Sequence, residues 1–263
     1  MTNLKIAGIV NVTPDSFSDG GLYFSAVDAI RYSLEVLHRG VDIIDIGGES
    51  TRPGAEEVTA GEEIRRTIPV IKGILREIPD AAISIDTYKS EVAKAALDEG
   101  VTFVNDISGG TFDAEMWKVV AGSKAKYILM HTPGRPSVMQ QMTTYSDVVN
   151  DVKGWLLSRA KEAESEGISE VIIDPGIGFG KTVEQNIQII SNIDKFTNSG
   201  FDVLVGLSRK SFIGKYLNLE TSERDFPSAI YEFFVALKGV RYIRTHNIEN
   251  ALNYRRMLES LNV

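Results

Sequence analysis

The sequence predicts an α/β protein that folds as one (β/α)8 barrel domain over residues 1–263. Short apolar runs alternate eight times with longer amphipathic segments, in units of about 30 residues, which is the pattern of that barrel. No linker-like or low-complexity stretch interrupts the units. Nearly every apolar run leads into a polar residue, as expected when all strands point their carboxyl ends at one mouth. The alternative is an open doubly wound sheet, which would carry ligand groups at only a few strand ends.

The predicted strands are short runs of apolar and β-branched residues. They cover residues 4–10, 41–46, 82–85, 102–104, 126–130, 170–173, 202–207 and 240–244. The polar residues at their ends are Asn11, Asp45, Asp86, Asn105, His131, Asp174, Ser208 with Arg209 and Lys210, and Arg244 with His246. If the barrel closes, these groups share one mouth.

Helical patterns fill the intervals between the strands. Ser25 and Thr59 each begin a helix with a capping box, because an acidic residue follows three positions later. Pro69 is expected to kink or restart the second of these helices. Apolar residues between 148 and 163 keep helical spacing, and a last helix occupies residues 248–261.

The predicted helix at residues 228–238 has little polar face, since most residues between Ile230 and Leu237 are apolar. An outer helix of a barrel normally shows a single apolar stripe. We therefore expect a second buried surface here, and an interface between subunits would supply one. The alternative is that loops of the same chain cover the helix.

The composition excludes several classes of function. Net charge is 28 − 36 = −8, which argues against general binding to nucleic acids or anionic membranes. No run approaches the roughly 18 apolar residues of a membrane span, and the first residues lack a signal-peptide pattern. The chain has no cysteine, which excludes disulfides, thiolate catalysis and cysteine-bound metals, and which fits a reducing cytoplasm.

Two carboxylates and one amide end three of the predicted strands, namely Asp86, Asp174 and Asn105. Two carboxylates at a barrel mouth can form an acid/base pair, bind a metal, or accept hydrogen bonds from a planar N–H edge. Because an amide is both donor and acceptor, the trio suits a heterocycle with mixed donors and acceptors. The structural alternative is that the carboxylates cap helices, and Asp86 does lead into one.

Arg52, Lys210 and Arg244 are cations at predicted loops or strand ends of an acidic protein. A cluster of this kind indicates an anionic ligand, although a single Lys or Arg is usually a solvated surface group. His246 follows Arg244 by two residues, so on a continuing strand the two would share a face.

The first loop, residues 11–21, is polar and rich in turn formers. We expect it to be mobile and to lie over the mouth. At its start, the side-chain carbonyl of Asn11 could bind Mg²⁺, with a pyrophosphate and waters completing the coordination shell.

The segment Asp174–Thr182 joins a predicted strand to a helix through alternating glycines. Gly176, Gly178 and Gly180 form G-x-G-x-G, which is not the dinucleotide-binding pattern. A Walker A loop is also excluded, because Pro175 stands where that motif needs glycine. The glycines either let a ligand approach the backbone or simply form a tight turn.

Taken together, these segments resemble the dihydropteroate synthase family over nearly the whole chain. The matching segments, one after each strand, are 11–21 (NVTPDSFSDGG), 47–54 (GGESTRPG), 84–88 (SIDTY), 105–109 (NDISG), 130–131 (MH), 174–181 (DPGIGFGK), 208–212 (SRKSF) and 244–246 (RTH). The resemblance implies a pterin-binding (β/α)8 barrel that is usually a homodimer. It implies condensation of 6-hydroxymethyl-7,8-dihydropterin pyrophosphate with p-aminobenzoate, giving 7,8-dihydropteroate and pyrophosphate in folate synthesis.

The resemblance also implies roles for individual residues. The pterin site would contain Asp86, Asn105, Asp174, Lys210 and Arg244, and all of these except Asn105 would be catalytic. The p-aminobenzoate pocket would contain Thr51, Arg52, Pro53, Phe179, Lys210 and Ser211. Pyrophosphate would be held by Asn11, Arg52, Arg244 and His246, with Mg²⁺ at Asn11. The implied mechanism is dissociative: pyrophosphate leaves first, and the neutral aryl amine then attacks a cationic pterin methylene.

Three places depart from the family pattern. Asn247 stands where the family commonly has aspartate, residues 225–228 replace a glycine-rich segment, and residues 132–134 replace the usual Met and Gly. None of them touches an assigned residue, but they leave the dimer packing and a third mobile region open. The glycine loop and residues 51–53 keep the family pattern, so we expect sensitivity to sulfonamides.

Two other interpretations stay open at this point. A pterin-binding methyltransferase barrel would share the strand-end carboxylates and amide, but it holds no pyrophosphate. Arg52, His246 and residues 208–211 therefore argue against it. A non-catalytic pterin-binding barrel would not need this set of anion-binding groups, although a sequence cannot demonstrate turnover.

Overall fold

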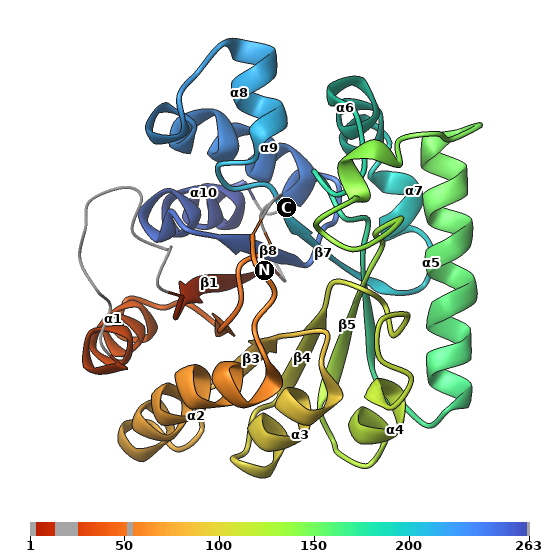
Figure 1. Cartoon of the computed structure of the whole chain (residues 1–263). Helices are drawn as coiled ribbons and strands as arrows, with labels where there is room; N and C mark the ends of the chain where they lie inside the picture. Colours follow the sequence, from red (N-terminus) through yellow and green to blue (C-terminus); the bar gives the residue numbers. More distant parts are fainter. Residues whose placement is uncertain (1–3, 14–25, 52–54, 262–263) are drawn as a thin grey trace.

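The computed structural model describes residues 4–13, 26–51 and 55–261, and in this part of the chain eight parallel strands close into a barrel. Neighbouring strands pair in sequence order, and β8 returns to β1 (Figure 1). The strands are β1 Lys5–Asn11, β2 Ile43–Gly47, β3 Ile83–Asp86, β4 Phe103–Asp106, β5 Lys126–Met130, β6 Val171–Asp174, β7 Asp202–Gly206 and β8 Tyr242–Thr245. The predicted (β/α)8 barrel is therefore confirmed.

Helices surround the barrel and cover its outer face (Figure 1). They are α1 Ala26–His38, α2 Ala60–Glu77, α3 Ser90–Asp98, α4 Met116–Ala121, α5 Val148–Ser165, α6 Val183–Ser191, α7 Asp194–Thr197, α8 Ser211–Leu217, α9 Asp225–Leu237 and α10 Ile248–Ser260, with short 3₁₀ turns η1 Met139–Gln141 and η2 Thr221–Glu223. Among the described residues, no helix is long and apolar enough to cross a membrane.

The predicted start of α2 is confirmed, because the Thr59 hydroxyl accepts a hydrogen bond from the amide of Glu62. The predicted start at Ser25 lies outside the described residues. A restart at Pro69 is wrong, since α2 continues through this residue as one helix. Buried residues on both sides of the proline, such as Thr67 and Ile71, lie on the same stripe. Their packing outweighs the one hydrogen bond that proline removes.

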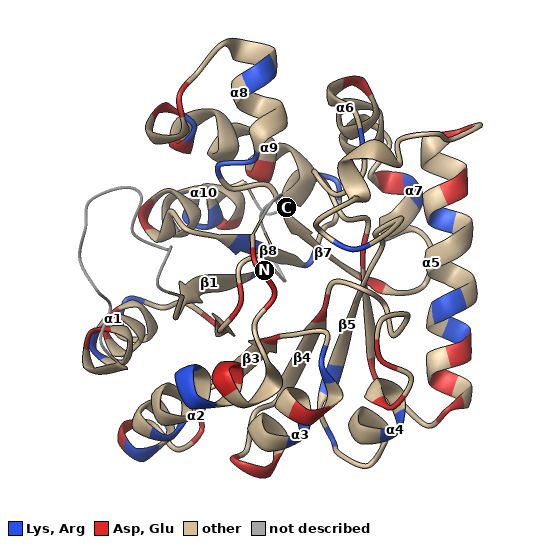
Figure 2. Ribbon diagram, viewed as in Figure 1, with Lys and Arg blue, Asp and Glu red and all other residues tan. Residues whose placement is uncertain are grey.

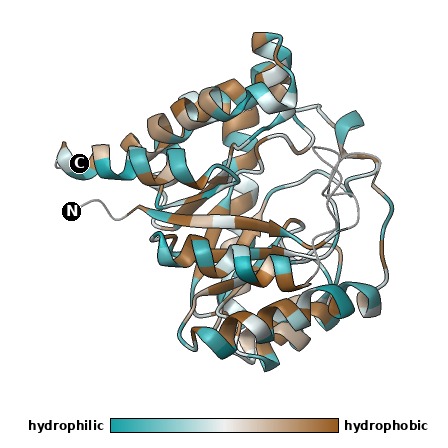
Figure 3. Ribbon diagram, turned by 90° about the vertical axis from the view of Figure 1, so that its left-hand side faces the viewer, coloured by the Kyte–Doolittle hydropathy of each residue, from teal (hydrophilic) through white to brown (hydrophobic). Residues whose placement is uncertain are grey.

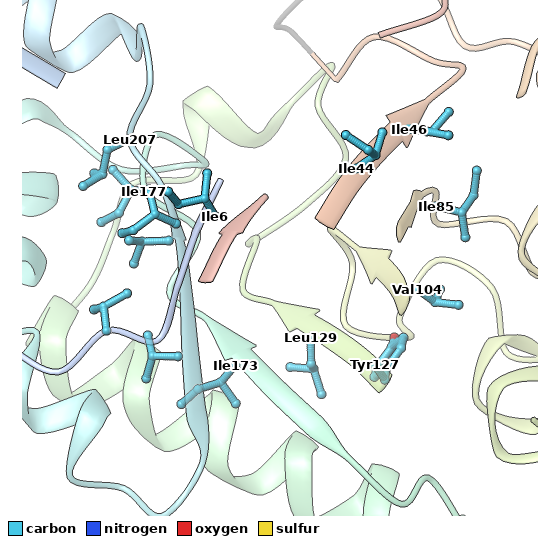
Figure 4. Close-up of a cluster of buried hydrophobic side chains, with 14 of the residues drawn as sticks. Ile6, Ile44, Ile46, Ile85, Val104, Tyr127, Leu129, Ile173, Ile177 and Leu207 are labelled. Atoms are coloured by element: carbon cyan, nitrogen blue, oxygen red, sulfur yellow. The ribbon is translucent and has the colours of Figure 1, made fainter. Parts of the chain in front are cut away.

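Alternation along each strand divides the buried side chains into two layers. One set points outward and packs beneath the helices; Ile44, Ile85 and Val104 are examples (Figure 4). The other set points inward and fills the barrel interior. This interior plug consists of Ala7, Ile43, Phe103, Ile128, Ile172, Leu204 and Tyr242. The barrel is thus a packed core with a floor, and not an open pore.

The polar residues of the mouth stand directly above the interior plug. They are Asp45, Asn105, Asp174 and Arg244, which follow the plug residues Ile43, Phe103, Ile172 and Tyr242 by two positions. A separation of two residues returns a strand to the same face. The inward face of each of these strands therefore changes from apolar to polar in one step, at the carboxyl end of the barrel.

Helix α9 differs from the expectation that it has little polar face. Its buried face carries two polar residues, Ser228 and Glu232, together with Val235. Its exposed face carries a stripe of large apolar residues: Phe226, Ile230, Phe234 and Leu237. Figure 3 shows apolar segments along the helices at the top of the molecule, where Figure 1 labels α8 and α9. Within the described part of the chain, loops do not bury this stripe.

Candidate active site

A cavity of about 350 Å³, which includes its part open to solvent, lies at the carboxyl-terminal mouth of the barrel. The units of β2 through β8 all contribute to its wall. The lining residues are Thr51, Asp86, Asn105, Ile107, Met130, Asp174, Ile177, Phe179, Gly206, Lys210 and Arg244. The size and the mixture of apolar walls with a few polar groups are typical of a small-molecule site. Figure 2 shows charged residues of both signs around the centre of the barrel, at β8 and its neighbours.

Arg244 on β8 binds two carboxylates from across the barrel. Its Nη2 donates to Oδ2 of Asp86 at 2.5 Å, and its Nε donates to Oδ2 of Asp45. The same oxygen of Asp45 also lies 3.4 Å from Nδ2 of Asn105. Asp45 is buried and does not line the cavity. Asp45 therefore orients Arg244 and Asn105, which line the cavity, from a position outside the cavity wall. Sequence reasoning noted Asp45 as a strand-end residue but gave it no role.

Burial sets the protonation of the carboxylates at the cavity. It raises the pKa of Asp174 to about 6, although the Gly176 amide and the Lys210 ammonium both act to lower this pKa. The amide donates to Oδ1 of Asp174 at 2.7 Å. Burial likewise raises the pKa of Asp86, and the Arg244 guanidinium opposes only part of this effect. Both groups are good hydrogen-bond acceptors at neutral pH and titrate close to it.

Lys210 and Phe179 meet at one wall of the cavity. The Lys210 Nζ lies 4.3 Å from the centroid of the Phe179 ring, which is cation–π geometry. Burial lowers the pKa of Lys210 to about 8, and the Asp174 carboxylate works in the opposite direction. Lys210 is therefore cationic at neutral pH and faces both an aromatic surface and a carboxylate.

The glycine loop after β6 has a packing function. Gly176, Gly178 and Gly180 all have positive φ, of 64°, 86° and 58°. A Cβ on Gly176 would lie 1.9 Å from the carbonyl oxygen of His131, and a Cβ on Gly180 would lie 2.1 Å from Cγ of Pro133. Only glycine permits both the backbone conformation and this approach to the β5–α5 connection. The loop then ends in a capping box at the start of α6, so the strand-to-helix turn and the ligand wall are the same segment.

The other predicted residues have different positions. Thr51 lines the cavity. Asn11 is the last residue of β1. A Cβ added at Gly47 would lie 3.4 Å from the Asn11 Oδ1 and 3.6 Å from the Asp86 Cβ, so both side chains lie next to Gly47.

Ser211 is the exposed first residue of α8, and neither Ser211 nor His246 lines the cavity. The backbone amide of His246 donates to the Ser208 hydroxyl at 3.2 Å, and its Nδ1 lies 3.1 Å from the same oxygen. Arg52, Pro53 and loop residues 14–21 lie outside the described residues.

A metal cage made by protein alone is absent from the described residues, because no group of three or more acidic or histidine side chains could hold an ion. Mg²⁺ is usually bound through few protein groups together with substrate phosphates and waters. The side-chain oxygen of Asn11, at the rim beside Asp86, is a suitable single ligand of this kind.

Two further buried residues, His131 and Lys181, were left without a role by the sequence. Both belong to recognisable segments, but a strand-end histidine and a lysine after a glycine loop carry no specific signal. The apolar wall residues Ile107, Met130 and Ile177 were also missed, since in a sequence they cannot be told from core residues.

Comparison with known proteins agrees with this geometry. The family model described as pterin binding enzyme matches residues 7–246. A dihydropteroate synthase of Synechocystis sp. is 44% identical over 247 residues, which covers 93% of this chain and 85% of that protein. The structure of the Xanthomonas albilineans dihydropteroate synthase with 4-aminobenzoic acid superposes with a TM-score of 0.91 at 36% identity, covering 99% of this chain and 93% of the other. The Anaplasma phagocytophilum enzyme with bound 6-hydroxymethylpterin-monophosphate has a TM-score of 0.89 at 35% identity, covering 98% and 99%.

Proposed function

The chain belongs to the dihydropteroate synthase family of pterin-binding enzymes, and on this premise we propose its substrates and mechanism. It is a transferase of folate synthesis that joins 6-hydroxymethyl-7,8-dihydropterin pyrophosphate to p-aminobenzoate. The observation that carries the assignment is one cavity that combines Asp86, Asn105 and Asp174 with the cations Lys210 and Arg244. These groups match a polar heterocycle that bears an anionic leaving group.

The pterin binds with its pyrimidine edge against the floor of the cavity. Adjacent N–H donors of that edge pair with the carboxylates of Asp174 and Asp86, and Asn105 supplies both a donor and an acceptor. The planar guanidinium of Arg244 stacks on the ring. Asp45 keeps the guanidinium in place when Asp86 turns to the ligand, since it binds a different nitrogen of Arg244.

The reaction is dissociative. The C–O bond between the pterin methylene and the pyrophosphate breaks first, and the electron pair leaves with the pyrophosphate. The resulting cation is delocalised into the ring nitrogens and lies over the buried carboxylates, which stabilise positive charge in a poorly solvated site. The neutral amine of p-aminobenzoate then attacks the methylene and loses a proton. An aryl amine is already nucleophilic, so no dedicated strong base is required.

The leaving pyrophosphate is held at the rim by Arg244, His246 and Asn11. Arg52, which lies outside the described residues, belongs to the same set. Asn11 would bind Mg²⁺ through its amide oxygen. A divalent ion bound there would neutralise charge on the departing pyrophosphate.

The p-aminobenzoate occupies the side of the cavity bounded by Thr51, Phe179 and Lys210, next to the pterin methylene. The Lys210 ammonium contacts the Phe179 ring and interacts electrostatically with Asp174, so in our proposal it serves both substrates. Ser211, Arg52 and Pro53 complete this pocket in our proposal. Inhibition by sulfonamides and a cytoplasmic location stay predictions from the sequence.

A pyrophosphate-release assay tests the function directly. With the pterin pyrophosphate, p-aminobenzoate and Mg²⁺, we expect equimolar pyrophosphate and dihydropteroate, and loss of turnover on removing Mg²⁺ with a chelator. Substrate with ¹⁸O in the bridging ester position tests the order of steps. Migration of the label to a non-bridging position without p-aminobenzoate is expected if pyrophosphate leaves first. A label that stays in place during prolonged incubation with the enzyme and Mg²⁺ in the absence of p-aminobenzoate would contradict the dissociative order.

We also propose that the enzyme is a homodimer that buries the exposed stripe of α9. Phe226 and Ile230 are 71% and 54% exposed, and a contiguous apolar stripe of this kind is typical of an interface. Light scattering after gel filtration should give about twice the chain mass of 28.9 kDa for the wild type. Ile230→Glu should yield monomers, whereas Val27→Glu, at a 70% exposed residue of α1, should not. A dimeric Ile230→Glu protein would refute this interface.

A further inference from the structure

We propose that Lys181 is a positioning residue of the p-aminobenzoate pocket, where its buried ammonium fixes the turn that presents Phe179. The identity of the pocket's ligand rests on the proposed function. The role of Lys181 in shaping the loop rests on its own contacts. Lys181 does not line the cavity and is 5% exposed, so it acts through the loop and does not touch substrate.

The ammonium of Lys181 binds both ends of one turn. Its Nζ donates to the carbonyl oxygens of Gly176 and Phe179, each at 2.9 Å. These carbonyls belong to the first and last residues of a four-residue turn, which is closed by the Phe179 amide donating to the Gly176 carbonyl at 3.1 Å. One cation therefore binds the carbonyls of both the first and the last residue of the turn.

The third partner of Lys181 is neutral. Its Nζ lies 3.2 Å from Nδ1 of His131. Burial and the nearby ammonium lower the pKa of His131 to about 3, so the imidazole is uncharged and can accept at Nδ1. All three N–H groups of the ammonium thus have acceptors, as a buried cation requires. Burial lowers the pKa of Lys181, and the Asp174 carboxylate opposes this effect by favouring the ammonium form.

Other side chains anchor the loop at residues outside the Gly176 and Phe179 carbonyls. Gln140 Nε2 donates to the Gly178 carbonyl at 2.9 Å, and the Tyr145 hydroxyl donates to the Gly180 carbonyl at 3.0 Å. Asn186 accepts from the Gly178 amide and donates to the carbonyls of Lys181 and Thr182, so it holds the end of the loop. Lys181 is the group that binds the carbonyls of Gly176 and Phe179. A methionine would fill the same space without the cost of burying a charge. The presence of a lysine is explained by the two carbonyls that it holds.

The consequence for the pocket is local. Phe179 is the last residue of the turn and forms the wall against which the Lys210 ammonium rests. The backbone of Asp174, by contrast, is held by the barrel, because its carbonyl accepts from the His131 amide at 2.9 Å. Its carboxylate accepts from the amide of Gly176, which is the turn residue farthest from Phe179 and adjoins the strand end. Loosening the turn should therefore disturb the p-aminobenzoate side of the cavity and leave the pterin side nearly unchanged.

Lys181→Met tests this proposal. Lys181→Gln is a milder variant that keeps an uncharged NH2 donor group, and Tyr145→Phe is a control on the same loop. Hydrogen exchange of the amides of residues 176–180 measures the turn without any substrate. Steady-state kinetics give KM for p-aminobenzoate, and calorimetry gives the Kd of 6-hydroxymethylpterin. For Lys181→Met we expect faster exchange and a KM for p-aminobenzoate raised about fivefold or more, with a pterin Kd within about twofold. Lys181→Gln should fall in between, and Tyr145→Phe should match the wild type within about twofold.

The outcomes separate this proposal from the proposed function. Unchanged loop exchange in Lys181→Met would overturn the role of Lys181, whatever the activity. Faster exchange with an unchanged KM for p-aminobenzoate would also overturn it, because the turn would then not shape the pocket. Equal losses for both substrates would assign Lys181 a general structural role instead. Failure of the wild type to turn over would refute the function, while the exchange data would still decide whether Lys181 holds the turn.

Discussion

Replacing Asp174 by asparagine should separate the function of its charge from its contribution to stability. Burial raises the pKa of Asp174 from a usual 3.8 to about 6. The folded protein therefore holds this proton more tightly than the unfolded chain does. Stability falls as pH rises from about 4 to 6, and at higher pH the ionised group costs about 3 kcal/mol at 1.36 kcal/mol per pKa unit.

Asparagine avoids this cost with little change in shape. Its side-chain oxygen can still accept from the Gly176 amide, which donates to Asp174 at 2.7 Å in the wild type. We expect the free energy of unfolding of Asp174→Asn to rise by about 1–3 kcal/mol at pH 8, or roughly 2–4 °C per kcal/mol in Tm. At pH 4, where the wild-type group is protonated, the two proteins should be nearly equal.

Activity should move in the opposite direction. An amide N–H facing the pterin leaves ring donors unpaired, which costs about 2–4 kcal/mol, or roughly 30- to 1000-fold in kcat/KM. Thermal unfolding at pH 4 and pH 8 and steady-state kinetics on the same preparation provide the measurement. A kcat/KM within threefold of the wild type would refute the role of Asp174 in the reaction. A lower Tm at pH 8 would refute the electrostatic argument.

Three further predictions follow from the same reasoning. The wild-type kcat/KM for the pterin pyrophosphate should fall at least tenfold per pH unit below about pH 6, because Asp174 and Asp86 are both protonated there. A pH-independent profile from 5 to 8 would contradict this. Burial raises the pKa of Glu232 to about 8, so the protein loses stability as pH rises from about 4.5 to 8. Glu232→Gln should therefore raise Tm at pH 8.5 but not at pH 5. An equal change in Tm at both pH values would count against this argument. Gly176→Ala should lower the free energy of unfolding in urea by about 2–4 kcal/mol, because its Cβ would meet the His131 carbonyl at 1.9 Å. Gly154→Ala, in an open helical position, should be neutral or stabilising. Similar unfolding midpoints for the two variants would contradict this prediction.

Much of the site could be predicted because each strand ends in its own signal. Asp86, Asn105 and Asp174 each follow an apolar run, and they line one cavity as expected. The spacing of the glycine loop also distinguishes it from the dinucleotide-binding and Walker A patterns. Local rules failed where packing decides, as at Pro69, which lies inside an unbroken helix.

The pairing of Arg244 with Asp45 could not be predicted. Their sequence separation is 199 residues, and they meet only because β8 pairs with β1 and closes the barrel. The hold of Lys181 on the 176–179 turn depends in the same way on His131 from the neighbouring β5 unit. Neither partner carries a local pattern that identifies the other.

The sequence by itself determined the order of strands and helices, the polar residue at each strand end, and the family. Those properties follow from periodicity and turn chemistry, which act over a few residues. Only the tertiary structure decided which polar residues face the interior together, and which buried charges hold them. That depends on strand register around a closed barrel, because a shift of one residue would turn every side chain of a strand to the opposite face.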